Sequence, residues 1–236
     1  MKAVKSSVPK HVGVILDGNR RFAKKLMMKP WKGHEWGAKK VEELLKWAKE
    51  VDVKELTLYS LSIQNLNRPK KELDYLMDLF KKEFQRLEED KTTMEEGIRV
   101  NIIGRTHLLP KDLQDTFNRI MEKTKNNSNY TINFAIAYGG REEVIDAIMK
   151  LSEDVKEGKQ DPEKINQEIF QDYLYTADEP DLIIRTGGDH RTSNFLIWQS
   201  NYAEWFFVEK CWPEFKKEDF MAIIEDYQNR ERRFGR

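Results

Sequence analysis

The sequence contains a single cysteine, Cys211, in 236 residues, which excludes an intrachain disulfide and a multi-cysteine metal site. Long apolar runs are missing too. None approaches the roughly 18 apolar residues of a membrane span, and the first ten residues have no signal-peptide core. The formal net charge is zero, with 41 basic and 41 acidic residues, so no excess of positive charge favours nucleic acid. These absences predict a cytoplasmic protein that binds no nucleic acid.

Common nucleotide and hydrolase motifs are missing as well. The chain has no Gly-x-x-x-x-Gly-Lys-Ser/Thr loop, no Gly-x-Gly-x-x-Gly, no Gly-x-Ser-x-Gly and no His-Glu-x-x-His. No linker, repeat or low-complexity stretch divides the sequence, so we expect one domain over residues 1–236, with a flexible N-terminus over residues 1–10. Charged residues make up 35% of the chain, which is typical of a thermophilic protein and equally of any well-solvated surface.

Apolar runs of strand length alternate with amphipathic segments of helix length. Strands are expected over residues 12–16, 56–61, 98–103, 130–138, 182–185 and 205–208. Helices are expected from residue 20 (capped by Asn19), over 38–50, from Pro69, from Pro110, and over 141–156 and 218–230. This alternation predicts an α/β domain with a central, mostly parallel six-stranded sheet flanked by helices.

Polar turns follow four of the expected strands, and parallel strands would bring them to one edge of the sheet. The first strand ends in Asp17-Gly18-Asn19-Arg20-Arg21. The fifth ends in Arg185-Thr186-Gly187-Gly188-Asp189, and Arg191 and Ser193 follow. Paired guanidinium groups with glycine and hydroxyl groups suit phosphate oxygens. A carboxylate among them suits Mg2+ that bridges those oxygens. The two segments therefore indicate a diphosphate site.

Five segments resemble the sequence blocks of the cis-prenyltransferases, the undecaprenyl and dehydrodolichyl diphosphate synthases. A match to any one block is weak evidence for the family, but five matches in family order across nearly the whole chain are highly specific. The matching positions are His11 to Arg21 with Gly33-His34 and Gly37; Leu58-Tyr59 with Ser62, Asn65 and Arg68-Pro69; Asn133 to Arg141; Arg185 to Phe195 with Trp198-Gln199 and Tyr202 to Glu204; and Asn229 to Gly235.

The resemblance implies a transferase that adds isopentenyl diphosphate to an allylic diphosphate primer, farnesyl or geranylgeranyl diphosphate, and makes each new double bond cis. The product would be a long-chain polyprenyl diphosphate for glycosyl carrier lipid. Because that product is a growing hydrocarbon, an apolar tunnel is expected, lined by the helices near residues 38–50 and 70–90 and the strand at 56–61. The enzyme would meet a membrane only through its lipid product.

Residue roles follow from the same match. Asp17 is implied to serve Mg2+ and the leaving diphosphate, and Glu204 to be a second Mg2+ ligand. The allylic diphosphate is implied to bind Gly18, Asn19, Arg20, Arg21 and His34, with Phe22 in the pocket wall. Isopentenyl diphosphate is implied to bind Arg185, Arg191, Thr192 and Ser193. Each residue also has a plainer explanation on its own, such as a turn-forming aspartate before glycine or a solvated arginine.

The second block is implied to add Ser62, Gln64, Asn65, Leu66 and Arg68 to the substrate site. In the family, the residue that matches Asn65 is often assigned as the proton acceptor. Because a neutral amide is a poor base, we expect it to orient a water molecule or the diphosphate that takes the proton.

The end of the chain, Arg233-Phe234-Gly235, resembles a motif that reaches the active site of the neighbouring subunit. The resemblance therefore implies a homodimer in which residues 230–236 complete the partner's site, with Arg233 and Gly235 as substrate contacts. On its own, the segment would be a frayed basic terminus.

Three positions depart from the family pattern. Pro30 stands where a phosphate-binding arginine is usual, Gln64 where glutamate is common and Leu66 where an aromatic residue is common. They favour an alternative, a non-catalytic or accessory subunit of a heteromeric cis-prenyltransferase. Asp17, the arginine pair and the tail oppose it. A second alternative is an unrelated phosphate-binding α/β enzyme.

Overall fold

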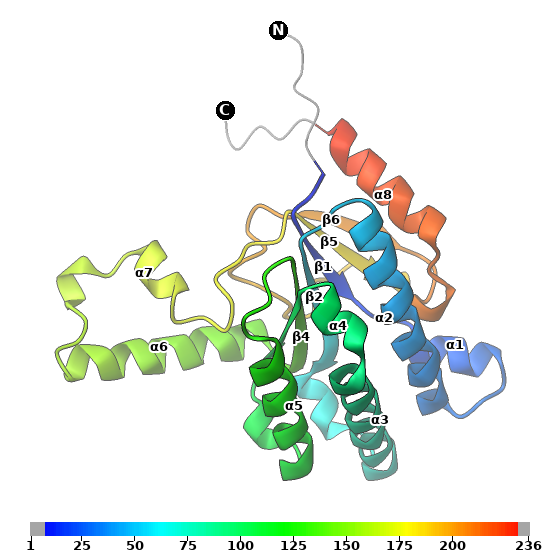
Figure 1. Ribbon diagram of the computed structural model, residues 1–236, viewed down its shortest axis with the longest axis horizontal. Helices are drawn as coiled ribbons and strands as arrows, with labels where there is room; N and C mark the ends of the chain where they lie inside the picture. Colours follow the sequence, from blue (N-terminus) through cyan, green and yellow to red (C-terminus); the bar gives the residue numbers. More distant parts are fainter. Residues whose placement is uncertain (1–7, 231–236) are drawn as a thin grey trace, which may run out of the picture.

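Six strands form one sheet in the order β3-β4-β2-β1-β5-β6 in the computed structural model, which describes residues 8–230 (Figure 1). All five strand pairings are parallel, which confirms the predicted α/β sheet. Every residue of β1 and β5 is buried, as expected for parallel strands covered on both faces. The strands are β1 (His11–Ile15), β2 (Glu55–Ser62), β3 (Ile98–Ile103), β4 (Tyr130–Tyr138), β5 (Leu182–Thr186) and β6 (Glu204–Val208).

The helices divide between the body of the domain and a projecting arm. In Figure 1, α2, α3, α4 and α5 lie in front of the sheet, and α6 and α7 extend away from it to the left. The α-helices are α1 (Asn19–Lys25), α2 (Gly33–Glu50), α3 (Lys70–Glu89), α4 (Lys91–Glu95), α5 (Lys111–Thr124), α6 (Gly140–Lys156), α7 (Gln167–Gln171) and α8 (Lys217–Asn229). Short 3-10 turns η1 (Pro30–Lys32), η2 (Ile63–Asn67), η3 (Thr106–Leu108), η4 (Pro162–Lys164) and η5 (Trp212–Glu214) connect them.

Two hydrophobic clusters occupy the two faces of the sheet. On the larger one, Phe84 of α3 meets Phe117 of α5 and Phe134 of β4 edge-on, with ring centroids 4.8 and 4.9 Å apart. On the other, Phe195 stacks on Tyr59 of β2 at 4.8 Å, so an irregular segment rather than a helix covers that area. Aromatic pairs in such geometries add to the stability that burial alone provides.

The order of the strands creates a crevice at the carboxyl end of β1. The chain adds β2 on one side of β1 and β5 on the other, and ligands bind where the strand order reverses in this way. Ile15 pairs with Tyr59 and with Arg185, so the turns after these three strands begin at the same level. The register therefore brings together segments that lie about 170 positions apart in the sequence.

One local expectation is wrong. Asn19 does not cap α1: Gly18 occupies the cap position in a left-handed conformation, and the Asn19 amide donates to the Leu16 carbonyl at 3.0 Å. The flexible N-terminus over residues 1–10 stays a prediction; within it, the backbone N–H of Lys10 donates to Asp181 at 2.7 Å. Residues 1–7 lie outside the described part of the chain. Within residues 8–230, no helix is long and apolar enough to span a membrane.

Replacing Phe117 by alanine should lower the free energy of unfolding by about 3–5 kcal/mol, because its ring is 1% exposed and leaves a cavity between α3 and α5. Urea denaturation at fixed protein concentration measures the change. Ile165→Ala, at a surface position, is the control and should change it by less than about 0.5 kcal/mol. A loss below about 1 kcal/mol for Phe117→Ala would contradict this packing.

Candidate active site

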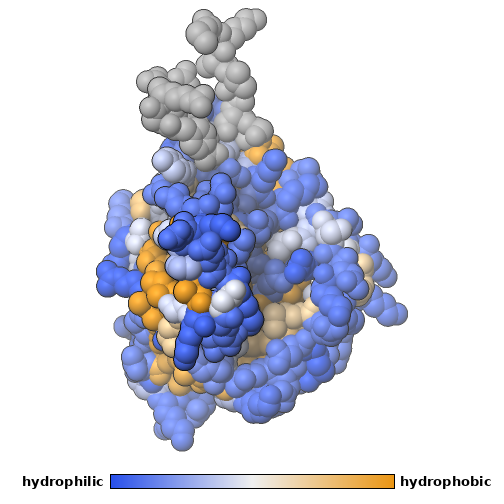
Figure 2. Space-filling view, turned by 90° about the vertical axis from the view of Figure 1, so that its left-hand side faces the viewer, coloured by the Kyte–Doolittle hydropathy of each residue, from blue (hydrophilic) through white to orange (hydrophobic). Residues whose placement is uncertain are grey.

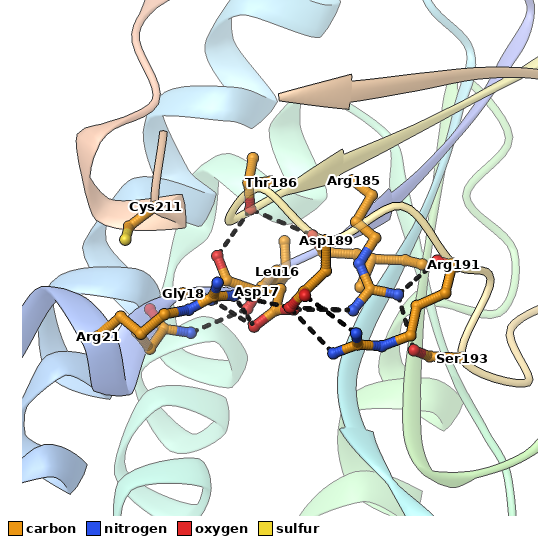
Figure 3. Close-up of polar contacts among 12 residues, drawn as sticks. Leu16, Asp17, Gly18, Arg21, Arg185, Thr186, Asp189, Arg191, Ser193 and Cys211 are labelled. Atoms are coloured by element: carbon orange, nitrogen blue, oxygen red, sulfur yellow. Dashed lines mark hydrogen bonds and ion pairs between the residues drawn. The ribbon is translucent and has the colours of Figure 1, made fainter. Parts of the chain in front are cut away.

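A carboxylate and a guanidinium group meet where β1 and β5 end. Arg185 Nη2 donates to Asp17 Oδ2 at 2.9 Å, and the Arg185 side chain is 3% exposed (Figure 3). The backbone N–H of Gly18 donates to Asp17 Oδ1 at 2.6 Å, and the Thr186 hydroxyl donates to the Asp17 carbonyl at 2.9 Å. The contacts fix both residues in one orientation at the crevice predicted by the strand order.

Two glycines make this approach possible. Gly18 has a φ of 102°, and a Cβ there would lie 2.7 Å from the Cα of Cys211. Gly187 has a φ of 94°, and a Cβ there would lie 2.6 Å from Arg21 Nη2. Residues with side chains rarely adopt these conformations, and a Cβ at Gly18 would also collide with the backbone of Cys211. Both glycines are therefore structural requirements of the site.

Three arginines surround Asp17 and Asp189. Arg21 Nη2 lies 3.1 Å from Asp17 Oδ1 and 3.1 Å from Asp189 Oδ2, and both terminal nitrogens of Arg191 lie 2.9 Å from the Asp189 oxygens. Burial raises the pKa of Asp189, but the charges of Arg191 and Arg21 outweigh it and hold that pKa below its usual range. The sequence match assigned Asp189 no binding role, whereas the structure places it at the centre of the cluster.

The loop after β5 brings Ser193 to Arg185, whose Nη1 donates to the Ser193 hydroxyl at 2.7 Å and to the Arg191 carbonyl. Ser193 and Asn194 adopt φ values of 50° and 63°. The start of α6 holds them there, since the N–H of Gly140 donates to the Asn194 carbonyl at 2.7 Å and that of Arg141 to its side-chain oxygen at 2.9 Å. The structure thus brings Arg185, Arg191 and Ser193 together, with Thr192 in the same loop.

A second polar cluster lies beside the first, around the start of α1. Arg68 contacts Asn65 Oδ1 at 3.1 Å, His34 Nε2 at 3.4 Å and the buried Glu72 at 3.2 Å, and Arg20 lies 3.5 Å from Glu72. Burial first, and then the charges of Arg68 and Arg20, lower the pKa of His34 to about 3. His34 is therefore neutral near pH 7 and accepts from Arg68. Sequence reasoning missed Glu72, although its i,i+4 spacing from Arg68 is a usable signal.

The remaining second-block residues have structural contacts. The Ser62 hydroxyl accepts the backbone N–H of Asn65 at 3.2 Å and so begins η2. Leu66 packs against the larger core cluster, and Phe22 meets Trp36 edge-on at 5.7 Å. Gln64 lies in η2. These contacts leave the substrate roles of Ser62, Gln64, Leu66 and Phe22 as predictions.

The structure does not bring Glu204 to Asp17. Glu204 begins β6 in register with Leu182 and Val12, whereas Asp17 follows the other end of β1. Five residues at about 3.3 Å each separate their levels by roughly 16 Å along the strands. Glu204 instead binds Arg230 at 3.0 Å. The expectation that both carboxylates of one chain hold one ion is therefore wrong, because Glu204 occupies the opposite edge of the sheet. Arg233 and Gly235 lie outside the described residues.

The residues near Asp17 suit a metal ion that a substrate helps to hold. Residues 8–230 contain no group of three or more His, Cys, Asp or Glu side chains placed to bind a metal. Mg2+ usually takes one or two carboxylates together with substrate phosphates and water, and Asp17 and Asp189 offer such oxygens. Asn19 Oδ1 and Arg185 Nε are buried here without a hydrogen-bond partner among the described atoms. The donor set therefore fits Mg2+ completed by a diphosphate.

Comparisons with known proteins show the family to which this chain is similar. The prenyltransferase family model described as undecaprenyl diphosphate synthase matches residues 15–235. The chain is 48% identical over 239 residues to a tritrans,polycis-undecaprenyl-diphosphate synthase (geranylgeranyl-diphosphate specific) of Pyrococcus abyssi, covering 100% of this chain and 90% of that one. The counterpart from Methanocaldococcus jannaschii is 47% identical, with 98% and 84% covered.

Solved structures show the same likeness. A lavandulyl diphosphate synthase from Lavandula x intermedia, crystallised with dimethylallyl diphosphate, has a TM-score of 0.92 at 33% identity, with 97% of this chain and 99% of that one covered. A probable undecaprenyl diphosphate synthase from Campylobacter jejuni has a TM-score of 0.81 at 31% identity, with 98% and 100% covered. The fold and site define an enzyme that transfers prenyl groups. The chain belongs to the undecaprenyl diphosphate synthase family of cis-prenyltransferases.

His34→Gln should reduce the loss of stability in acid. The folded protein binds the His34 proton only near pH 3, whereas the unfolded chain binds it near pH 6.5, so the free energy of unfolding falls as pH decreases through that range. Between pH 6.5 and 5 the variant should lose about 1.6 kcal/mol less than the wild type. Urea denaturation at both pH values tests this, with exposed His107→Gln as the control. Equal losses in all three proteins would contradict a neutral His34.

Proposed function

We propose that this enzyme adds isopentenyl diphosphate repeatedly to geranylgeranyl diphosphate and makes a long-chain cis-polyprenyl diphosphate for glycosyl carrier lipid. The observation that carries the proposal is the pair of adjacent cationic clusters at one sheet edge, with Asp17 between them. One cluster holds Arg185, Arg191 and Ser193, and the other holds Arg20, His34 and Arg68. Two diphosphates require two such places. The names of the archaeal relatives support the choice of primer.

Isopentenyl diphosphate would bind the first cluster. Asp17 and Asp189 form ion pairs with Arg185, Arg21 and Arg191. A diphosphate offers these guanidinium groups stronger bidentate acceptors than a single carboxylate can. Its arrival would release oxygens of Asp17 and Asp189 from their arginine partners. The acidic residues thus keep the arginines in position until substrate arrives.

The allylic diphosphate would bind the second cluster, where it must leave as the new carbon–carbon bond forms. Arg20, Arg68 and neutral His34 offer donors to its oxygens, and Glu72 Oε1 lies within 3.5 Å of both guanidinium groups and so bridges them. Mg2+ held by Asp17 would supply further positive charge for the departing group. Fixed charges of this kind stabilise a transition state without reorganising. Asn65 is tied to Arg68 and would orient the group that accepts the proton.

The hydrocarbon would lie in a cavity that begins beside this cluster. The cavity has a volume of about 670 Å³ and extends from Asn19 and His34 between α2 and α3. Its apolar walls come from α2, α3 and the β4 residues Ile132 and Phe134, whereas β2 contributes Ser60. The cavity thus lies between the two helices that we expected to line a tunnel. Its lining includes more residues of β4 than of the strand expected at residues 56–61.

We further propose a homodimer assembled through the projecting arm. Ile145, Ile148 and Met149 form an apolar stripe on α6 and are 51%, 45% and 65% exposed. Figure 2 faces the side from which α6 and α7 project and shows apolar surface there. Since Glu204 lies at the sheet edge opposite Asp17, it is better placed to serve a partner's site than its own.

Asp17→Asn should lower turnover of isopentenyl diphosphate at least a hundredfold, because the neutral amide neither binds Mg2+ nor balances Arg185. Incorporation of radiolabelled isopentenyl diphosphate onto geranylgeranyl diphosphate measures it, and chelation with EDTA should have the same effect on the wild type. Asp74→Asn, at an exposed position on α3, is the matched control.

Near wild-type turnover of Asp17→Asn would contradict the mechanism. Pro30, Gln64 and Leu66 motivate the accessory-subunit alternative. A pure wild-type chain that incorporates nothing, yet becomes active when mixed with a paralogous chain, would establish it.

Met149→Glu should convert the dimer into monomers, since it buries a charge within the α6 stripe. Light scattering coupled to size-exclusion chromatography measures the mass. Met27→Glu introduces the same charge at a 96% exposed position away from α6 and should leave the dimer intact. If the Met149→Glu and Ile148→Glu variants both remain dimers, the interface lies elsewhere.

A further inference from the structure

The loop that carries Ser193 has a strained backbone. Ser193, Asn194 and Leu196 adopt φ values of 50°, 63° and 43°. Residues with side chains rarely adopt this left-handed region, and they stay there only where the surrounding structure holds them. Asparagine tolerates the region better than serine or leucine does. The loop after β5 therefore depends on contacts with neighbouring elements to keep its shape.

Asn194 is the point at which the start of α6 holds this loop. The backbone N–H of Gly140 donates to the Asn194 carbonyl at 2.7 Å, and that of Arg141 donates to Asn194 Oδ1 at 2.9 Å. Asn194 Nδ2 donates in turn to Glu142 Oε2 at 2.8 Å. Three consecutive residues at one helix end thus bind a single residue of the loop. We name Asn194 and Glu142 together the clamp.

Two buried glycines leave room for the clamp. A Cβ at Gly139 would collide with the Glu142 carboxylate and would lie 2.7 Å from Asn194 Nδ2. A Cβ at Gly140 would lie 3.0 Å from the backbone nitrogen of Ile197 and 3.2 Å from the Asn194 carbonyl oxygen. The Gly-Gly pair between β4 and α6 therefore allows the helix end to approach the loop closely enough for these hydrogen bonds.

The residue before Asn194 faces the first cationic cluster. Figure 3 shows Ser193 beside Arg185, whose Nη1 donates to the Ser193 hydroxyl at 2.7 Å. Because the hydroxyl accepts this bond, its own hydrogen can donate to a phosphate oxygen. The Tyr59 hydroxyl donates to the Ser193 carbonyl at 3.3 Å and supports the loop from the sheet. The Asn194 side chain is bound to α6, so it would act on a substrate through the loop.

We propose that the clamp positions the Ser193 hydroxyl and so sets the affinity of the first cluster for isopentenyl diphosphate, without changing the affinity for the primer. The inference rests on the proposed function and adds two positioning residues to it. A donor that is already in place costs little ordering free energy when the substrate binds. Without the clamp, the loop would relax toward negative φ values and carry Ser193 away from Arg185. The hydrogen bonds of the clamp among residues 8–230 join the loop to α6, whereas the second cluster surrounds the start of α1.

Exchanging the donor and the acceptor of the clamp tests this proposal. Asn194→Asp keeps the oxygen that accepts from Arg141 and a residue type suited to positive φ, but it replaces the donor by an oxygen that repels Glu142. In the double variant N194D/E142Q the glutamine amide donates to the aspartate, so the hydrogen bond returns in the opposite direction. Glu142→Gln alone keeps an acceptor for Asn194, and Glu142→Ala removes it. Glu168→Gln, at an exposed position on α7, is the matched control.

Initial rates of isopentenyl diphosphate incorporation, with the other substrate saturating, give a KM for each substrate. Asn194→Asp should raise the KM for isopentenyl diphosphate at least about tenfold, and Glu142→Ala at least about threefold. The KM for geranylgeranyl diphosphate should change less than about twofold in both. The double variant and Glu142→Gln should stay within about threefold of the wild type, and the control should be unchanged.

Equal rises in the two KM values, or a double variant no better than Asn194→Asp, would overturn the positioning role. If urea denaturation shows that Asn194→Asp is unfolded, Glu142→Ala decides the question, since its side chain lies half-buried in the first turn of α6. An unchanged KM for isopentenyl diphosphate in that variant would then overturn the proposal. A wild type that incorporates no isopentenyl diphosphate would instead refute the proposed function, and with it the substrate that the clamp serves.

Discussion

The site depends on the contact between Asp17 and Arg185, two residues that only the parallel pairing of β1 with β5 brings together. Arg185 is almost fully buried, and a buried charge needs a partner. Asp17 is that partner, and the turns at Gly18 and Gly187 allow the two side chains to approach each other. Every other group of the first cluster is arranged around this pair. The parallel pairing of β1 with β5 is therefore required both for the sheet and for the site.

In the proposed function, each of the two polar clusters binds the diphosphate of one substrate. Around Asp189, acidic and basic groups nearly balance, so a diphosphate would exchange one set of ion pairs for a stronger one. Around His34, burial and two neighbouring arginines keep the imidazole neutral, so it accepts from Arg68 and adds no positive charge. The cavity that starts beside His34 would receive the apolar part of the allylic substrate in the proposed function.

Much of this arrangement was predictable from the sequence. The apolar runs predict all six strands, and the polar turns after β1 and β5 predict a shared edge, because both are local patterns. Side-chain partners were not predictable. Glu204 looked like a companion of Asp17 until the register of β6 placed it at the far edge. Asn19 looked like a cap, but Gly18 turns the chain one residue earlier. Asp189 and Glu72 acquire their contacts to Arg21 and Arg20 only because the fold brings distant segments together.

The most direct test is a crystal structure with isopentenyl diphosphate, Mg2+ and a thio-linked geranylgeranyl diphosphate analogue that cannot ionise. The account predicts one diphosphate on Arg185, Arg191 and Ser193, a second on Arg20, Arg68 and His34, and Mg2+ at Asp17. The geranylgeranyl chain should lie between α2 and α3. A single shared diphosphate position, or a hydrocarbon chain outside that cavity, would contradict it.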